Sequence, residues 1–160
     1  MKEIFMTNSN AVKNNSLWVA GDFTLWLINN SGTNPININL RKSEPLHLKL
    51  LGEEWAQLFY GVLGCPVADN YSTEDSLKDW LVRNEIKFRQ SISNFPMLGE
   101  LHDIHSKILF NQEQVKSLSE EVLRAIPMAK DNKSALEGLA KLATACRVAI
   151  EKEKFLYLNG

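Results

Sequence analysis

The chain has 160 residues, of which 44% are hydrophobic and 23% are charged, and its formal net charge is −1. A chain of this length buries enough apolar surface to fold without disulfides or a structural metal. Its near-zero charge argues against general electrostatic binding to nucleic acid or to anionic membranes. We therefore expect one domain, residues 1–160, that binds neither nucleic acid directly nor a membrane.

The cysteine content and the start of the chain predict a cytoplasmic protein. Cys65 and Cys146 are too few for a disulfide framework, so reduced and buried thiols are expected. Residues 1–6 lack the apolar run of a signal peptide. No stretch of the sequence reaches the ~18 apolar residues of a membrane helix.

Residues 1–50 are predicted to be rich in strands. Nine asparagines fall within residues 1–40, and asparagine favours turns over helix interiors. The leucines at 46, 48 and 50 alternate with polar residues, which favours a further strand, although the same residues could lead directly into a helix. Runs of β-forming residues predict strands over 4–6, 17–20, 23–28 and 36–40, with a hairpin turn at Gly21-Asp22.

Residues 53–154 are predicted to be helical. Apolar residues recur at helical spacing, and capping residues, glycines and prolines divide the region. The expected helices cover 53–63, 72–92, 96–109 and 111–126, and a last helix begins after Asp131 or Asn132. An apolar strand follows at 155–158. The order of elements predicts an α+β fold, a small and mostly antiparallel sheet packed against about five helices.

The last helix is expected to be the scaffold of the domain. One apolar stripe includes Leu139, Cys146 and Ile150, and several alanines keep the helix slim. We therefore expect Leu139 and Ile150 to be buried.

Candidate chemistry is sparse. His102 and His105, three residues apart on an expected helix, would form a metal site together with Glu100 or Asp103. The spacing differs from the four residues of helical zinc peptidases, and His105 also fits the apolar stripe of its helix. Because the sequence has no nucleophile elbow, phosphate loop or dinucleotide fingerprint, we expect no catalytic residue, bound metal or cofactor.

The four tryptophans suggest a binding surface. Trp55 and Trp80 lie on helical apolar stripes and are expected in the core. Trp18 and Trp26 belong to predicted strands that are apolar on both faces. Helices would cover one of these faces, and other parts of the protein or a partner would cover the second.

The last 65 residues or so resemble a known family. The segments 95–101 (FPMLGEL), 115–121 (VKSLSEE), 135–139 (ALEGL), 143–146 (ATAC) and 155–158 (FLYL) are similar to small cytoplasmic immunity proteins encoded beside bacterial polymorphic toxins, including contact-dependent growth inhibition systems. The resemblance implies a non-enzymatic inhibitor that binds one cognate toxin domain, often an RNase or another nuclease, and blocks its active site. A monomer in that complex is expected.

Acidic residues at helix starts would suit such a role, because a nuclease is usually basic where it holds phosphates. The candidates, together with Trp18 and Trp26, are Glu74, Asp75, Asp79, Glu113, Glu120 and Glu121. The alternatives are a metal-dependent hydrolase that uses His102 and His105, and a non-catalytic adaptor or ligand-binding protein.

Overall fold

The structure, a computed structural model, describes residues 22–29, 43–66, 74–102 and 107–160; within α2 it describes no side chains for 74–78, 80 and 81. Its strands are β1 (Phe23–Ile28), β2 (Glu44–Leu50), β3 (Lys107–Phe110) and β4 (Phe155–Asn159). Its α-helices are α1 (Gly52–Ala56), α2 (Glu74–Ser91), α3 (Pro96–Gly99), α4 (Gln112–Ala125) and α5 (Lys133–Glu151). The fold is α+β, as the order of elements predicts.

The four strands form one antiparallel sheet in the order β2-β1-β4-β3. The C-terminal strand is therefore central, and β1 pairs with it along its length. Trp26 lies opposite Tyr157 of β4 and opposite Pro45 of β2. The expected strands at 23–28 and 155–158 are confirmed, and the alternating leucines before Leu50 form a strand.

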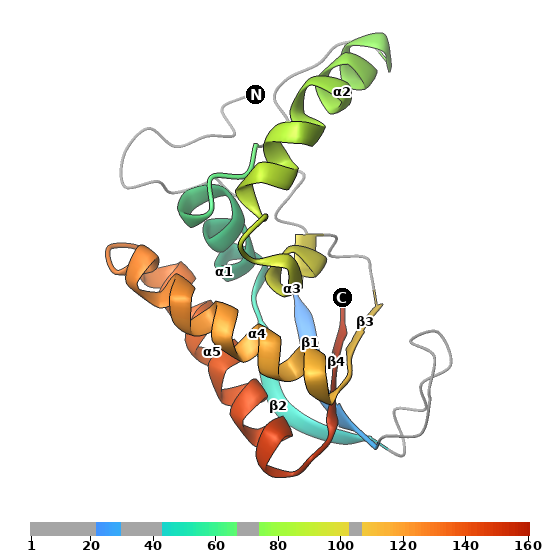
Figure 1. Cartoon of the computed structure of the whole chain (residues 1–160), viewed down its shortest axis with the longest axis vertical. Helices are drawn as coiled ribbons and strands as arrows, with labels where there is room; N and C mark the ends of the chain where they lie inside the picture. The colour runs from blue at the N-terminus through green and yellow to red at the C-terminus, as the bar shows by residue number, and fades with distance from the viewer. Residues whose placement is uncertain (1–21, 30–42, 67–73, 103–106) are drawn as a thin grey trace.

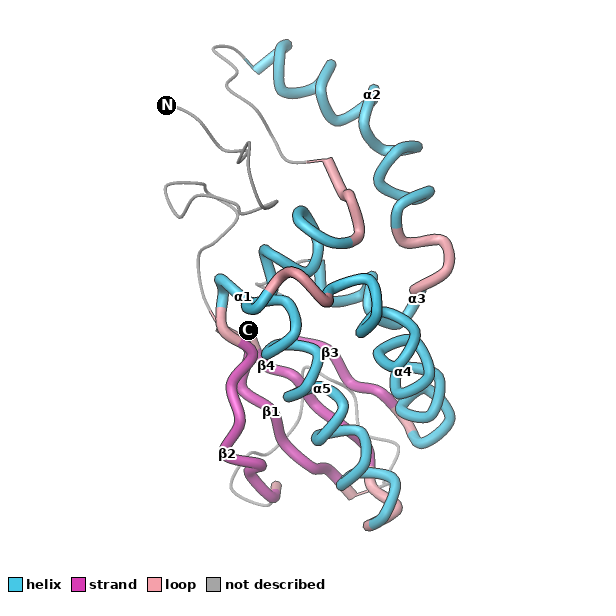
Figure 2. Tube along the Cα trace, turned by 90° about the vertical axis from the view of Figure 1, so that its left-hand side faces the viewer, coloured by secondary structure: helices cyan, strands magenta, loops and turns pink. Residues whose placement is uncertain are grey.

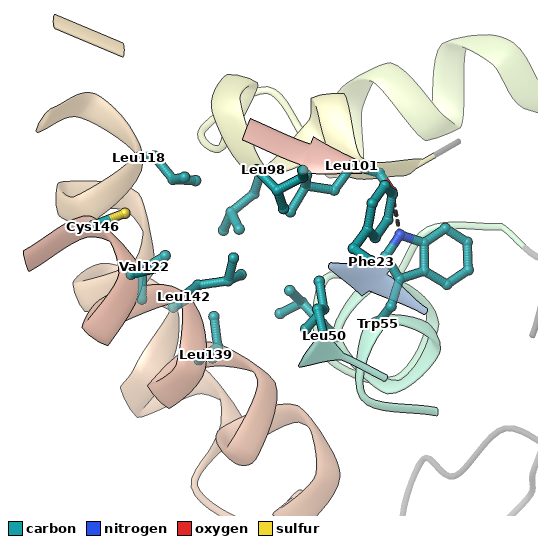
Figure 3. Close-up of a cluster of buried hydrophobic side chains, with 14 of the residues drawn as sticks. Phe23, Leu50, Trp55, Leu98, Leu101, Leu118, Val122, Leu139, Leu142 and Cys146 are labelled. Atoms are coloured by element: carbon teal, nitrogen blue, oxygen red, sulfur yellow. Dashed lines mark hydrogen bonds between the residues drawn. The ribbon is translucent and has the colours of Figure 1, made fainter. Parts of the chain in front are cut away.

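Helices α4 and α5 pack side by side over one face of the sheet (Figures 1 and 2). Leu25 and Leu27 of β1 point into the core between the two layers, as do Leu156 and Leu158 of β4. Figure 3 shows Leu118 and Val122 of α4 facing Leu139 and Leu142 of α5, with Leu98 and Leu50 completing the cluster.

Short helical pieces close the end of this core. α1 continues into a π-helix, Gln57–Val62, in which the amide of Leu63 bonds to the carbonyl of Leu58. Trp55 is buried, as predicted, and its indole N–H donates to the carbonyl of Leu101 (Figure 3). The chain therefore links α1 to the turn after α3 through a buried aromatic side chain.

The predicted helix over 96–109 is wrong at residues 107–109, which belong to a strand. Pro96 does begin a helix, but α3 ends at Gly99 and a 3-10 turn, Glu100–His102, follows it; residues 103–106 lie outside the described part of the chain. Residues 107–110 form β3, whose Ile108 and Phe110 face the core at a strand's period of two. A short apolar run such as 107–110 fits the period of a helix as well as that of a strand, and pairing with β4 makes it a strand.

The helix caps predicted from the sequence at Asn111 and Asn132 are present in the structure. The side chain of Asn111 accepts from the amide of Gln114 at the start of α4, and that of Asn132 accepts from Ala135 at the start of α5. Ile150 departs from the expected burial, because its side chain is 38% exposed while Leu139 is fully buried. The expected strands at 4–6, 17–20 and 36–40, and Gly21 of the hairpin turn, lie outside the described residues.

Among the described helices, none combines the length and the apolar character that a transmembrane span requires.

Candidate partner-binding surface

The sheet has a second face, opposite α4 and α5, that no described helix covers (Figure 2). We call it the outer face. Its residues alternate with the core-facing ones, and none belongs to the core cluster; they include Thr24, Trp26, Ile28, Leu109, Phe155 and Tyr157. Ile28 and Tyr157 are buried, whereas Trp26 keeps part of its surface exposed. Among the described aromatic residues of this face, Trp26 and Phe155 therefore keep part of their surface accessible, and Trp26 lies nearer the paired strand β2.

Hydrogen bonds hold the indole of Trp26 in place. Its Nε1–H donates to Oγ1 of Thr24 at 3.3 Å, and that hydroxyl in turn donates to the carbonyl of Asn159 at 3.2 Å. The side chain is thus ordered before any partner arrives, which lowers the entropy that binding would cost.

A bulge in β2 opens a depression beside Trp26. Thr24 pairs with Lys49 and Trp26 pairs with Pro45, so three residues of β2 lie opposite Leu25 alone. His47, in the middle of the three, has a left-handed backbone with φ of 57°. The resulting depression of about 760 Å³ is lined by Thr24, Leu25, Trp26, Pro45, His47, Leu48, Lys49 and Lys141.

A partly buried ion pair lies at the edge of this depression. Nζ of Lys141 on α5 lies 2.9 Å from both carboxylate oxygens of Glu54 and 2.9 Å from the carbonyl of Lys49. Glu54 is only 3% exposed and also accepts from the amide of Leu51. The pair joins α5, α1 and β2, and so links three elements at the edge of the depression.

The predicted acidic residues do not gather at this surface. Asp79 is exposed on α2, while Glu113 and Glu120 are exposed on α4, which packs on the opposite face of the sheet from Trp26. Glu74 and Asp75 begin α2, but their side chains are outside the described set, as is Trp18 altogether. The structure therefore separates the candidates into at least three places.

Glu121 corrects the sequence-based prediction. Its side chain is 4% exposed, and its carboxylate accepts hydrogen bonds from the amides of Met97 and Leu98 at 2.9–3.0 Å. These amides are unpaired donors at the start of α3, which a carboxylate satisfies well. Glu121 therefore joins α4 to α3 and is not available to a partner.

His102 is engaged within the protein. Its Nδ1 lies 2.9 Å from the carbonyl of Gly99, so Nδ1 must carry the proton and donate, and its ring packs against Phe88 with centroids 5.0 Å apart. Asp103 and His105 lie outside the described residues. Among those that the structure does describe, no group of three or more His, Cys, Asp or Glu side chains could hold a metal ion.

The two cysteines are buried and not disulfide-bonded. Burial raises the pKa of the Cys65 thiol and that of the Cys146 thiol to about 12. Because the thiolate is the reactive form, neither side chain is suited to act as a nucleophile.

No protein-family model, curated protein or solved structure matches this chain. Trp26 was a candidate binding residue from the sequence, whereas the depression beside it was not predicted. A bulge depends on how two distant strands pair, and the only local signal, His47 interrupting a leucine alternation, also fits a regular strand with one wet face.

Proposed function

We propose that the protein is an immunity protein, which binds a cognate secreted toxin domain in the cytoplasm and neutralises it by blocking its active site. The observation that carries this proposal is the partly exposed Trp26 beside the depression at the β2 edge of the sheet. Tryptophan is enriched among the few residues that dominate binding energy at protein interfaces.

The residues that line the depression suggest which kind of partner side chain would bind there. Its apolar wall, formed by Trp26, Leu48 and Pro45, suits a projecting apolar side chain of the partner. His47 and Lys49 are exposed at its border and would favour an acidic neighbour. Nuclease active sites often contain a carboxylate that acts as a general base, so covering such a site would both pair its charge and exclude substrate.

This arrangement changes the basis of the proposal. The sequence suggested acids that approach a basic toxin surface, whereas the outer face offers an aromatic anchor with basic neighbours. The resemblance to immunity proteins, the buried thiols typical of a reducing compartment and the rigid aromatic surface all support the same class of function. An RNase remains the toxin activity that we propose.

The test is to co-express the chain with the toxin domain encoded next to its gene, and to measure co-purification and protection from growth arrest. The variant Trp26→Ala should weaken binding by roughly 30-fold or more, as loss of an interface hot spot does. Leu123→Ala, which truncates an apolar side chain 60% exposed on α4, is the matched control and should bind as the parent does.

The two parts of the proposal can fail separately. If the parent chain neither binds the toxin domain nor protects cells, the immunity function is wrong. If the parent protects and Trp26→Ala binds equally well, with its thermal stability unchanged, the function stands and the outer face is not the contact surface.

A further inference from the structure

Helix α2 extends away from the two layers (Figure 1). It has 18 residues, so it is about 27 Å long. Its last turn holds it to the body, through the Phe88 ring against His102 and through a hydrogen bond from Ser91 Oγ to the carbonyl of Gly64. Its other face carries the two most exposed large apolar residues described, Val82 at 73% and Ile86 at 67%.

The exposed residues of α2 form a seam. Asp79, Val82, Ile86 and Arg89 are spaced by three, four and three residues, the spacing at which helices pair along a shared stripe. All four are exposed to solvent. The two apolar residues stand at the middle of the seam, and a charge of opposite sign stands at each end.

The two ends of the seam carry opposite charges, Asp79 and Arg89, so two copies of the seam that run in opposite directions would be complementary. If two copies of α2 lie antiparallel about a two-fold axis at the level of Asn84, Val82 of one copy meets Ile86 of the other. The same axis places Asp79 opposite Arg89, five residues to either side of Asn84. Each pair occurs twice, as a two-fold axis requires.

We infer that α2 is a self-association surface, at which a second copy of this chain binds through antiparallel α2–α2 pairing. This extends beyond the proposed immunity function and does not depend on it. It also departs from the monomer expected from the family resemblance. The two cross-copy Asp79–Arg89 pairs favour this register over an in-register parallel arrangement, which would put Asp79 opposite Asp79 and Arg89 opposite Arg89.

The present partners of these charges do not oppose pairing. Arg89 forms an ion pair of 3.1 Å with Glu85 one turn earlier, with side chains 74% and 62% exposed. Nε of Arg83 donates to the backbone carbonyl of Asp79 at 3.3 Å, leaving the Asp79 carboxylate outside that bond. Exposed pairs of this kind contribute little to stability, so exchanging them for contacts between copies costs little.

The experiment is sedimentation equilibrium of the full chain across a wide concentration range, with three charge variants. Asp79→Arg alone and Arg89→Glu alone each put like charges opposite each other, and should weaken the dimer at least about tenfold. The double variant D79R/R89E restores opposite charges at both positions, and should dimerise within a few-fold of the parent. An equimolar mixture of the two single variants should form a heterodimer. In it the introduced arginine of one copy faces the introduced glutamate of the other, and the unchanged Arg89 faces the unchanged Asp79.

Two further variants define the apolar part of the seam. Val82→Ser with Ile86→Ser should leave the chain monomeric, whereas Leu123→Ser on α4 should leave the dimer unchanged. Monomeric behaviour of the parent at hundreds of micromolar would overturn the inference. So would a dimer that the α2 variants do not weaken, or a double variant no better than the single ones. Binding of the toxin domain that is lost on changing Val82 and Ile86, in a chain that stays monomeric, would assign α2 to the toxin instead.

Discussion

The two longest described helices, α5 with 19 residues and α2 with 18, have opposite environments: α5 is the most enclosed by other elements and α2 the most exposed. α5 packs against α4, α1, the π-helix and strands β2 and β4. α2 is held chiefly at its last turn, and much of its length carries exposed side chains. Helices of nearly equal length thus serve as the centre of the core and as a projection from it.

The composition of each helix explains the difference. α5 presents alanines and Gly138 to its neighbours; a Cβ at Gly138 would lie 3.1 Å from both Glu54 Cβ and Leu50 Cδ1. Such small residues let α1 and β2 approach the helix axis closely. α2 instead alternates charges of both signs around Val82 and Ile86, which suits a surface that meets another protein.

The largest expected effect is on α5. Leu139→Asp places a charge in the fully buried core between α4 and α5, and should lower the free energy of unfolding by about 4 kcal/mol or more. Ile150→Asp on the same helix replaces a side chain that is 38% exposed, and should cost about 1 kcal/mol or less. Urea denaturation measures both. Equal losses would mean that the two positions are buried alike, contrary to the structure.

The next effect concerns the buried carboxylate on α4. Glu121→Ala leaves the amides of Met97 and Leu98 without their acceptor, which should destabilise the protein by about 2 kcal/mol. Its neighbour Glu120 is exposed, so Glu120→Ala is the matched control and should change stability by about 0.5 kcal/mol or less. Thermal unfolding would reveal the difference, and an unaffected Glu121→Ala protein would show that α3 needs no such cap.

The reactivity of the two cysteines should measure separately how easily α2 and α5 open from the core. Cys146 lies on α5 in the core, whereas Cys65 lies near the end of α2, where a hydrogen bond with Ser91 partly offsets the burial that raises its pKa. We expect a thiol reagent to modify Cys65 faster than Cys146, because detachment of α2 is a smaller opening than separation of α4 from α5. Mass spectrometry of partly alkylated protein gives both rates. Identical rates would indicate that α2 and α5 open together.

Alkaline pH should destabilise the protein through the same thiols. Both pKa values rise to about 12 in the folded state, while an unfolded thiol ionises near pH 8.5. The unfolded chain therefore loses these protons first, and stability should fall from about pH 8.5 upward. Replacing both cysteines by alanine should flatten the pH dependence measured by urea denaturation over pH 8–10.

The smallest expected effect is on α2. Val82→Ser with Ile86→Ser removes apolar groups that the folded monomer leaves exposed, so the free energy of unfolding should change by about 0.5 kcal/mol or less at low protein concentration. Urea denaturation at low micromolar concentration tests this. A loss as large as that for Glu121→Ala would mean that this face of α2 packs within the chain.

Local patterns predicted the helices and their caps well. The stripe on α5, the caps at Asn111 and Asn132, and the proline that begins α3 all act within a few residues of chain. They can therefore be predicted from the sequence. Trp55 was correctly assigned to the core, and Trp26 was correctly assigned to a strand.

The C-terminal strand of the sheet was predicted, but three other features that depend on distant contacts were not. β3 is a strand because β4 lies beside it, and the depression exists because β2 bulges against β1. Glu121 and Glu120 are adjacent in sequence and equally acidic, yet only Glu121 points toward the start of α3. Helical periodicity places an acid on a helix but does not show which unpaired amides lie nearby.

The position of β4 has a consequence for synthesis. Thr24 of β1 bonds to Asn159 of β4 across 135 positions of the chain, and β4 separates β1 from β3 in the sheet. A ribosome must therefore make nearly all of this sequence before the sheet can close. Until then, the nascent chain presents Leu25, Leu27 and Ile108 without their partners, so that chaperones have a defined apolar target during translation.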